Sequence, residues 1–482
     1  MTTKNEPDPD PNSTESPTTQ EIGKVVSPQQ ANRILISLMF PAMLMPLLSS
    51  MSRIALPILR EDFQIESETT AWIITAFAIP FMVLMPVYGR LSDGLGKRRL
   101  LLAGIIIFAI GTALTVAATS LSVLMFGRVI QGIGASGMTP LGMAFLASIF
   151  APRERGKALG TWSSVGPILA FVGPLLAGFL VEIWGWRAAF APTFLLAVIA
   201  FLVVKQNIPA GLSIVKPDFL RQFDWTGVGL LCVTTTSLLI YLSSRPITGV
   251  ASLQDWRFLI IMVVTLTLFF VWERRHSNPF VDFRIFRNHT FSLASFCASL
   301  RMVTMGGLSL LLPLYLTDVR HLSATSIGFM AMITPGTMIL LVRFGGQISD
   351  RWGSRWPTLF GLGTMGLVMV GFGLISDAVP LFMVAGLLSV YGVGAGLVLA
   401  SLHRAAMSYV SEDEVSAAAG LYSMLRFAGA LIGGAVAGVV LQNGLDFAPS
   451  DLIAYQRVFF FFGFPALIGA LAGLRFRETT ST

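Results

Sequence analysis

The segment GRLSDGLGKR at residues 89–98 recurs 257 residues later as GQISDRWGSR at residues 346–355, and this repetition decides the fold. Gly, Asp, Gly and Arg stand at the same spacing in both copies. Three further matches follow in the same order, at offsets of 256 to 260: ALPILRED (55–62) with LLPLYLTD (311–318), RVIQGIGASG (128–137) with LSVYGVGAGL (388–397), and the glycines of 160–178 with those of 420–438. Ordered matches at nearly one offset indicate an internal duplication.

The composition places the duplicated chain in a membrane. Apolar residues make up 54% of the 482 residues and charged residues only 12%, whereas soluble proteins carry about 25% charged residues. Apolar runs long enough to cross a bilayer, at about 20 residues each, are predicted at 33–59, 71–88, 100–119, 122–149, 159–181, 188–206, 226–243, 257–272, 291–316, 324–344, 357–376, 380–402, 416–441 and 455–474. The sequence therefore predicts an all-α polytopic membrane protein with 14 transmembrane helices.

The duplication also predicts the domain organisation. Residues 1–31 are polar and without an apolar period, which is typical of a disordered tail. Residues 32–206 form the N-terminal six-helix half and 291–474 the C-terminal six-helix half. Residues 207–290 form a linker with two extra transmembrane helices, and residues 475–482 a second short tail.

Basic residues predict the orientation in the membrane. With both termini cytoplasmic, 23 of the 33 Lys and Arg fall in cytoplasmic segments, six in outer loops and four within spans. Because cytoplasmic loops are enriched in Lys and Arg, this bias favours cytoplasmic termini. The net charge of +7 is then explained by the loops, and no nucleic-acid partner is expected. The expected partner is the lipid bilayer of a plasma membrane or bacterial inner membrane.

The sequence argues against an enzyme. It has no Walker loop, no HExxH motif, no paired His/Cys set and no catalytic Ser/His/Asp grouping. We therefore expect no metal site and no cofactor. Duplicated helical halves around a central cavity are instead the usual construction of secondary transporters.

Several motifs resemble those of a known family. GRLSDGLGKR, RVIQGIGASG and GPILAFVGPLLAG (166–178) resemble signatures of the major facilitator superfamily. FDWTGVG (223–229) and ERRHSNPFVDFRIFR (273–287) resemble the segments that flank the two extra helices in its fourteen-span drug:proton antiporter family. The resemblance covers the chain after residue 31. It implies a monomer that exports amphiphilic small molecules by alternating access, with a proton gradient as the driving force.

The resemblance and the repeat together give three sets of candidate residues. The predicted cytoplasmic gate contains glycines that let helix ends approach and charged groups that can pair there: Gly89, Asp93, Gly96, Arg98, Gly346, Asp350, Gly353 and Arg355. The exporter motif of the fifth helix, where small residues permit close packing, comprises Gly166, Pro167, Gly173, Pro174 and Gly178. The predicted substrate pathway comprises Arg53, Arg128, Gln131, Trp162, Arg301 and Arg426.

One departure from the family leaves the function open. Where the family carries an Asp and an Asn in its first helix, this chain has Leu48 and Arg53. All carboxylates fall in loops or within a turn of a span end, and all four histidines in or beside loops. The usual intramembrane proton-binding residue is thus missing, and the intramembrane charges are arginines. Arg53 and Arg301 would favour an anionic substrate, unless they only hold the helices together. An organic-anion carrier or facilitator without proton antiport is the alternative.

Overall fold

The computed structural model describes residues 27–64, 67–210, 219–242, 248–250, 253–276, 281, 283–322, 324–408, 410, 414–447 and 449–476. Within these ranges the regular structure is helical and contains no strand. Of the predicted tails, 1–31 and 475–482, residues 1–26 and 477–482 lie outside the described residues, whereas residues 28–31 form the first turn of a helix. Helices are the expected form, because a single apolar segment in lipid must satisfy its backbone hydrogen bonds internally.

The first half consists of eight helical segments. They are α2 (Pro28–Asp62), α3 (Ser67–Val83), α4 (Met85–Leu95), α5 (Lys97–Val116), α6 (Leu121–Ala135), α7 (Met138–Ile149), α8 (Pro152–Ser163) and α9 (Val165–Asn207). Helices α3 and α4 are parts of one path bent by 42°. Helix α9 is interrupted at Gly185, whose φ of 78° and ψ of 176° are not helical.

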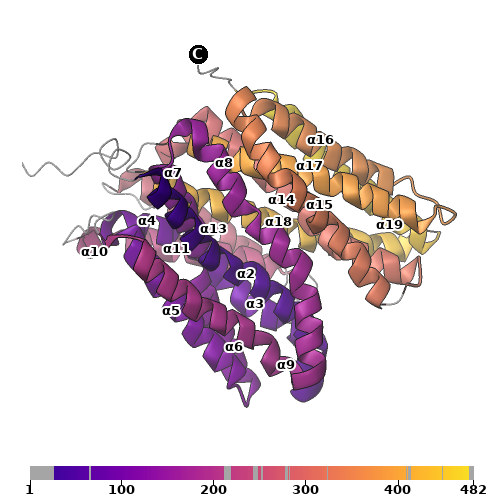
Figure 1. The fold of residues 1–482 in the computed structure, drawn as a ribbon. Helices are drawn as coiled ribbons and strands as arrows, with labels where there is room; N and C mark the ends of the chain where they lie inside the picture. Colours follow the sequence, from indigo (N-terminus) through magenta and orange to yellow (C-terminus); the bar gives the residue numbers. More distant parts are fainter. Residues whose placement is uncertain are drawn as a thin grey trace, which may run out of the picture.

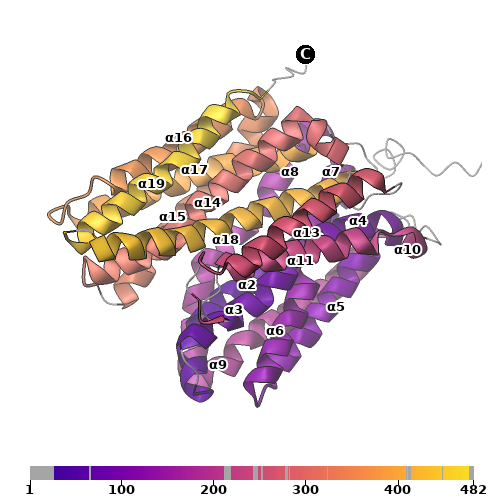
Figure 2. The same cartoon turned by 180° about the vertical axis from the view of Figure 1, so that it is seen from behind.

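The second half contains six helices, and a linker joins it to the first. The six are α14 (His289–Asp318), α15 (Ala324–Trp352), α16 (Arg355–Phe372), α17 (Leu381–Met407), α18 (Val415–Phe447) and α19 (Asp451–Gly473). The described linker comprises α10 (Phe219–Gln222), α11 (Trp225–Leu242), α13 (Trp256–Arg275) and a 3₁₀ turn, η2 (Phe283–Arg287). Helices α11 and α13 pack on each other beside α3 and α18 (Figure 2).

Within the described residues, eleven helices are long and apolar enough to cross a membrane, or twelve if α3 and α4 form one span. The predicted segments 159–181 and 188–206 correspond to the helical parts of α8 and α9 before and after Gly185, which this number counts once. Helix α16 has 18 residues and is not among the eleven. An all-helical fold is therefore confirmed, and fourteen spans stay a prediction.

Large apolar side chains cover the outside of the bundle. Phe329, Leu340, Leu367 and Phe382 are each more than 60% exposed. Soluble proteins rarely expose contiguous apolar surface on this scale, so lipid is the medium that these faces fit. The chain is thus a multi-pass membrane protein.

The two halves meet at one end of the molecule and diverge toward the other (Figures 1 and 2). The end where they meet carries the α4–α5 and α15–α16 turns, and we call it the gate end. Gly96 in the first turn has a φ of 87° and Gly353 in the second a φ of 75°. Glycine adopts such positive φ angles without strain, which explains why both copies of the repeat place a glycine there.

Candidate functional site

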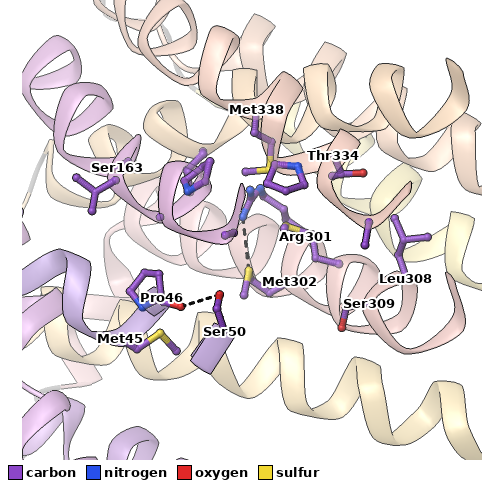
Figure 3. A pocket seen from close by; sticks show the side chains of 18 of the residues that line it. Met45, Pro46, Ser50, Ser163, Arg301, Met302, Leu308, Ser309, Thr334 and Met338 are labelled. Carbon is purple, nitrogen blue, oxygen red and sulfur yellow. Dashed lines mark hydrogen bonds between the residues drawn. The ribbon is translucent and has the colours of Figure 1, made fainter. Parts of the chain in front are cut away.

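A cavity of about 630 Å³ lies between the two halves. Helices α2, α7, α8 and α9 line it from the first half, and α14, α15, α17 and α18 from the second. Figure 3 shows Met45, Pro46 and Ser50 facing Arg301 and Met302 across it. Its methionines are Met45, Met302, Met305, Met332 and Met338. Because methionine is flexible and polarisable, such a wall can adapt to ligands of different shape.

Among the described residues, the charged groups that line the cavity come from the second half. Arg301 of α14 and Arg426 of α18 are 2% and 9% exposed. One terminal nitrogen of Arg301, Nη2, donates to the carbonyl oxygen of Ala395 at 3.1 Å. Among the described residues that line the cavity, none is an Asp or Glu. The described wall is therefore positively charged and otherwise mostly apolar.

The structure brings three of the six predicted pathway residues to the cavity. Trp162 lines it together with Arg301 and Arg426. The Trp162 indole also donates to the carbonyl oxygen of Leu38 at 3.2 Å, which fixes α8 against α2. The side chain of Arg53 lies outside the described residues.

Arg128 and Gln131 require a correction. Arg128 donates through Nε to the carbonyl oxygen of Ile73 at 3.1 Å and through Nη1 to Oε1 of Gln131 at 2.9 Å. Gln131 in turn donates to Thr112 at 3.0 Å. These bonds tie α6 to α3 and α5 inside the first half, away from the cavity lining. Both residues therefore hold the first half together in this conformation.

His403 is a cavity residue that the sequence placed beside a loop. Helix α17 continues to Met407, so His403 lies inside the helix, 2% exposed and lining the cavity. Its Nδ1 lies 3.0 Å from Oγ of Ser163, which belongs to the other half. Leu399, four residues earlier on the same face of α17, also lines the cavity, and nothing in the sequence marks that face.

At the gate end, glycines bring the backbones of the two halves into contact. A Cβ atom on Gly89 would lie 2.4 Å from the carbonyl oxygen of Ser416, and one on Gly346 would lie 2.5 Å from that of Gly156. Gly89 and Gly346 are repeat equivalents, and so are Gly156 and Ser416, which are 260 residues apart. The internal repeat thus produces the same helix contact twice, once on each side of the gate.

Asp350 is the carboxylate that connects the halves at this contact. Its oxygens accept hydrogen bonds from the backbone nitrogens of Gly156 at 3.1 Å and Lys157 at 2.9 Å, both in α8 of the first half. Oδ1 also pairs with Nε of Arg404 at 3.0 Å. Arg404 belongs to the second half, so it holds the carboxylate in position for α8.

Three other predicted gate residues make contacts within one half. Asp93 pairs with Arg90 on its own helix at 3.7 Å. Arg98 donates to the carbonyl oxygen of Lys205 at 2.8 Å, at the end of α9. The Arg355 guanidinium lies 5.5 Å from the ring centroid of the neighbouring Trp356. These contacts brace the two turns from their own side.

The exporter motif of the fifth helix divides into two roles. Gly166, Pro167 and Pro174 line the cavity. A Cβ on Gly173 would lie 2.6 Å from Cβ and Oγ of Ser50 in α2, so this glycine permits close packing. Gly178 has nothing within 4 Å of the equivalent position. The expectation of close packing therefore holds for Gly173 and not for Gly178 in this conformation.

The pair offers a matched test of helix packing. Gly173→Leu is expected to lower the free energy of unfolding by about 1–3 kcal/mol, because the added side chain must displace α2. Gly178→Leu is expected to change it by less than about 0.5 kcal/mol. Chemical unfolding of the purified variants in detergent measures both. An equal change in the free energy of unfolding for the two variants would show that α2 and α9 can separate at Gly173 without loss of stability.

Comparison with known proteins agrees with this architecture. The family described as Major Facilitator Superfamily matches residues 38–434 and, in a second match, 294–482. The riboflavin transporter RibZ of Clostridioides difficile is 27% identical over 367 residues, covering 75% of this chain and 78% of that protein. The multidrug resistance protein Stp of Mycobacterium tuberculosis is 28% identical over 396 residues, covering 82% and 72%.

Solved structures share the fold. The human organic anion transporter MFSD10 superposes with a TM-score of 0.69 at 17% identity, covering 92% of this chain and 99% of that one. The proton:xylose symporter XylE gives a TM-score of 0.67 at 12% identity, covering 92% and 95%. The chain belongs to the Major Facilitator Superfamily and is a secondary transporter that resembles the drug efflux members of that family.

Proposed function

We propose that this protein exports amphiphilic small molecules by alternating access, as a multidrug-type efflux transporter of the plasma or bacterial inner membrane. The cavity between the halves carries this proposal. It is large enough for a drug-sized ligand, mostly apolar, and lined by five methionines and a few polar groups. The similarity to proteins named for multidrug resistance supports the same substrate class.

The positions of the contacts between the halves support alternating access. Asp350 and the glycine pairs connect the halves at the gate end, and the halves diverge toward the other end (Figure 1). We propose fourteen spans with both termini in the cytoplasm. The gate is then cytoplasmic, and this conformation opens toward the outside, as expected for the state that releases an exported substrate.

We further propose that a proton gradient drives export. The described cavity lining has no carboxylate, but it contains His403, whose imidazole can accept a proton. Its bond to Ser163 crosses from one half to the other. A proton exchanged at this position would act where the halves separate.

Transport into proteoliposomes tests the function. The full-length protein is reconstituted, and uptake of cationic, neutral and anionic amphiphiles is followed with and without an imposed pH gradient. We expect accumulation of at least one class, dependent on the gradient. Empty liposomes are the control. Uptake that ignores the gradient would remove proton coupling, and no protein-dependent uptake of any class would remove the proposed function.

The alternative is an organic-anion carrier or facilitator without proton antiport. The specific observation in its favour is the pair Arg301 and Arg426, which line the cavity without an accompanying described carboxylate. The same uptake assay separates the two functions, because the alternative requires anion transport that persists at equal pH on both sides.

A further inference from the structure

Four buried side chains of the second half carry polar atoms that lack a hydrogen-bond partner among the described residues. Arg301, Tyr391, Tyr422 and Arg426 are between 1% and 9% exposed. Within the part of the chain that the structure describes, Nε of both arginines and the hydroxyl groups of both tyrosines have no hydrogen-bond partner. Buried polar groups are normally paired. Four such groups in one cluster therefore call for an explanation.

The cluster opens to the cavity. Arg301, Tyr391 and Arg426 line it, and Tyr422 lies one helical turn from Arg426 on the same face of α18. The ring of His403, also a lining residue, lies 5.6 Å from that of Tyr422. Three helices, α14, α17 and α18, thus direct hydrogen-bond donors toward the same part of the second half.

The charge of the cluster is unbalanced. Both guanidinium groups are buried in the wall of the same cavity, where low polarity strengthens the repulsion between like charges. Buried like charges without a counter-ion are unfavourable, and an arginine inside a membrane normally pairs with another group. The described carboxylates at the gate are engaged elsewhere, as Asp350 is with Arg404. The group that completes this cluster must therefore be an anion and must come from outside the chain's described residues.

We propose that the cluster binds the acidic group of an amphiphilic organic anion, a carboxylate or sulfonate, and that Arg301 and Arg426 donate to its oxygens. Arginine suits this role because its fork of N–H donors matches planar acidic groups. The hydroxyl groups of Tyr391 and Tyr422 add neutral donors. This inference rests on the proposed transport of amphiphiles and specifies the charge of the substrate.

The apolar remainder of the ligand is assigned to the opposite wall. Met45 and Pro46 of α2 and Pro167 and Pro174 of α9 line the first-half side of the cavity, where the described residues carry no charge. An anion bound in this orientation contacts both halves at once (Figure 3). Its head group would move with the second half, and its apolar body would bridge to the first.

Three probes with one apolar body test the assignment: 1-pyrenebutyrate, 1-pyrenebutanol and 1-pyrenebutylamine, which differ in head-group charge. Binding is measured on the full-length protein in lipid nanodiscs, with empty nanodiscs subtracted. We expect the acid to bind most tightly. Arg301→Gln and Arg426→Gln are each expected to weaken the acid about 10- to 100-fold, since a hydrogen bond to a charged group is lost, and to change the alcohol less than about threefold.

Further variants keep the test independent of folding. Arg426→Lys retains the charge and should recover part of the affinity for the acid. Tyr391→Phe should weaken the acid about three- to tenfold. Arg343→Gln removes an exposed arginine of α15 that is not among the lining residues, and should change nothing.

The outcomes separate this inference from the proposed function. Tighter binding of the amine or the alcohol than of the acid would overturn the anion site and leave an amphiphile transporter. Equal losses for acid and alcohol in both arginine variants would also overturn it, since the arginines would then only support the helices. Binding of none of the three probes would overturn the anion site, and the uptake assay would still decide the proposed function separately.

Discussion

Asp350→Asn is expected to lower transport by about tenfold or more while leaving the protein folded. The carboxylate accepts two backbone hydrogen bonds from α8 and pairs with Arg404. Charged hydrogen bonds contribute about 1.5–3 kcal/mol each, and each 1.4 kcal/mol changes an equilibrium tenfold. Because the bonds to Gly156 and Lys157 cross between the halves, their loss disfavours the closed gate and not the packing within either half.

Uptake by proteoliposomes and thermal unfolding, measured on the same preparation, check this expectation. Asp377→Asn is the matched control, because Asp377 is an exposed carboxylate in the α16–α17 loop at the other end of the molecule. Asp93→Asn removes the repeat equivalent and is also expected to slow transport greatly. Full transport by Asp350→Asn would show that the backbone contacts alone close the gate.

The gate could be predicted from the sequence because its chemistry is repeated. Gly89 and Gly346 stand out by self-comparison alone, 257 residues apart. The structure shows them packed against Ser416 and Gly156, which are themselves repeat equivalents 260 residues apart. Close helix contacts restrict the residue type to glycine, so this requirement can be recognised in the sequence. The partners of Asp350 were not visible, because backbone N–H groups of α8 are offered by any sequence.

The cavity was harder to predict, because the sequence does not show which face of an apolar helix packs against which neighbouring helix. Helix α6 is apolar apart from Ser122, Arg128 and Gln131, and nothing in its sequence shows that Arg128 bonds to Ile73 and does not line the cavity. Arg301, which is also an arginine in an apolar helix, does line the cavity. His403 was missed for a related reason, because the predicted apolar run 380–402 ends just before it, which indicates a position near water. In the structure Ser163 of the other half lies against its side chain.

The break at Gly185 shows what local composition leaves out. Two apolar segments on either side of Gly185 predict two spans, and in the structure its non-helical φ and ψ separate two helices. Trp186 donates to Asp62 at the end of α2, whereas the carbonyl oxygen of Lys205 accepts from Arg98 at the gate end, so the second helix runs back toward the gate. Length and hydropathy describe each segment alone and do not reveal the positive φ of a single glycine.

The last prediction concerns the glycine contact at the gate, where Gly89→Val is expected to prevent closure. A Cβ at residue 89 would lie 2.4 Å from the carbonyl oxygen of Ser416 and 3.2 Å from Cα of Gly420. Both neighbours are backbone atoms of α18, so a rotamer change cannot relieve the overlap, and α4 and α18 must move apart. Overpacking of this kind costs about 1–3 kcal/mol, which reduces the closed-gate population roughly 5- to 150-fold.

Two measurements are needed for Gly89→Val, because lost transport alone would not distinguish a blocked gate from a damaged fold. Transport should fall with the closed population, and spin labels at the ends of α2 and α14 remote from the gate should approach each other, with native Cys232 and Cys297 replaced first. Gly386→Val is the matched control, since nothing lies within 4 Å of a Cβ there. Because α4 and α18 belong to different halves, each half should stay folded and only the angle between them should change. Wild-type label distances in Gly89→Val, with transport intact, would mean that the halves can work without closing at this contact.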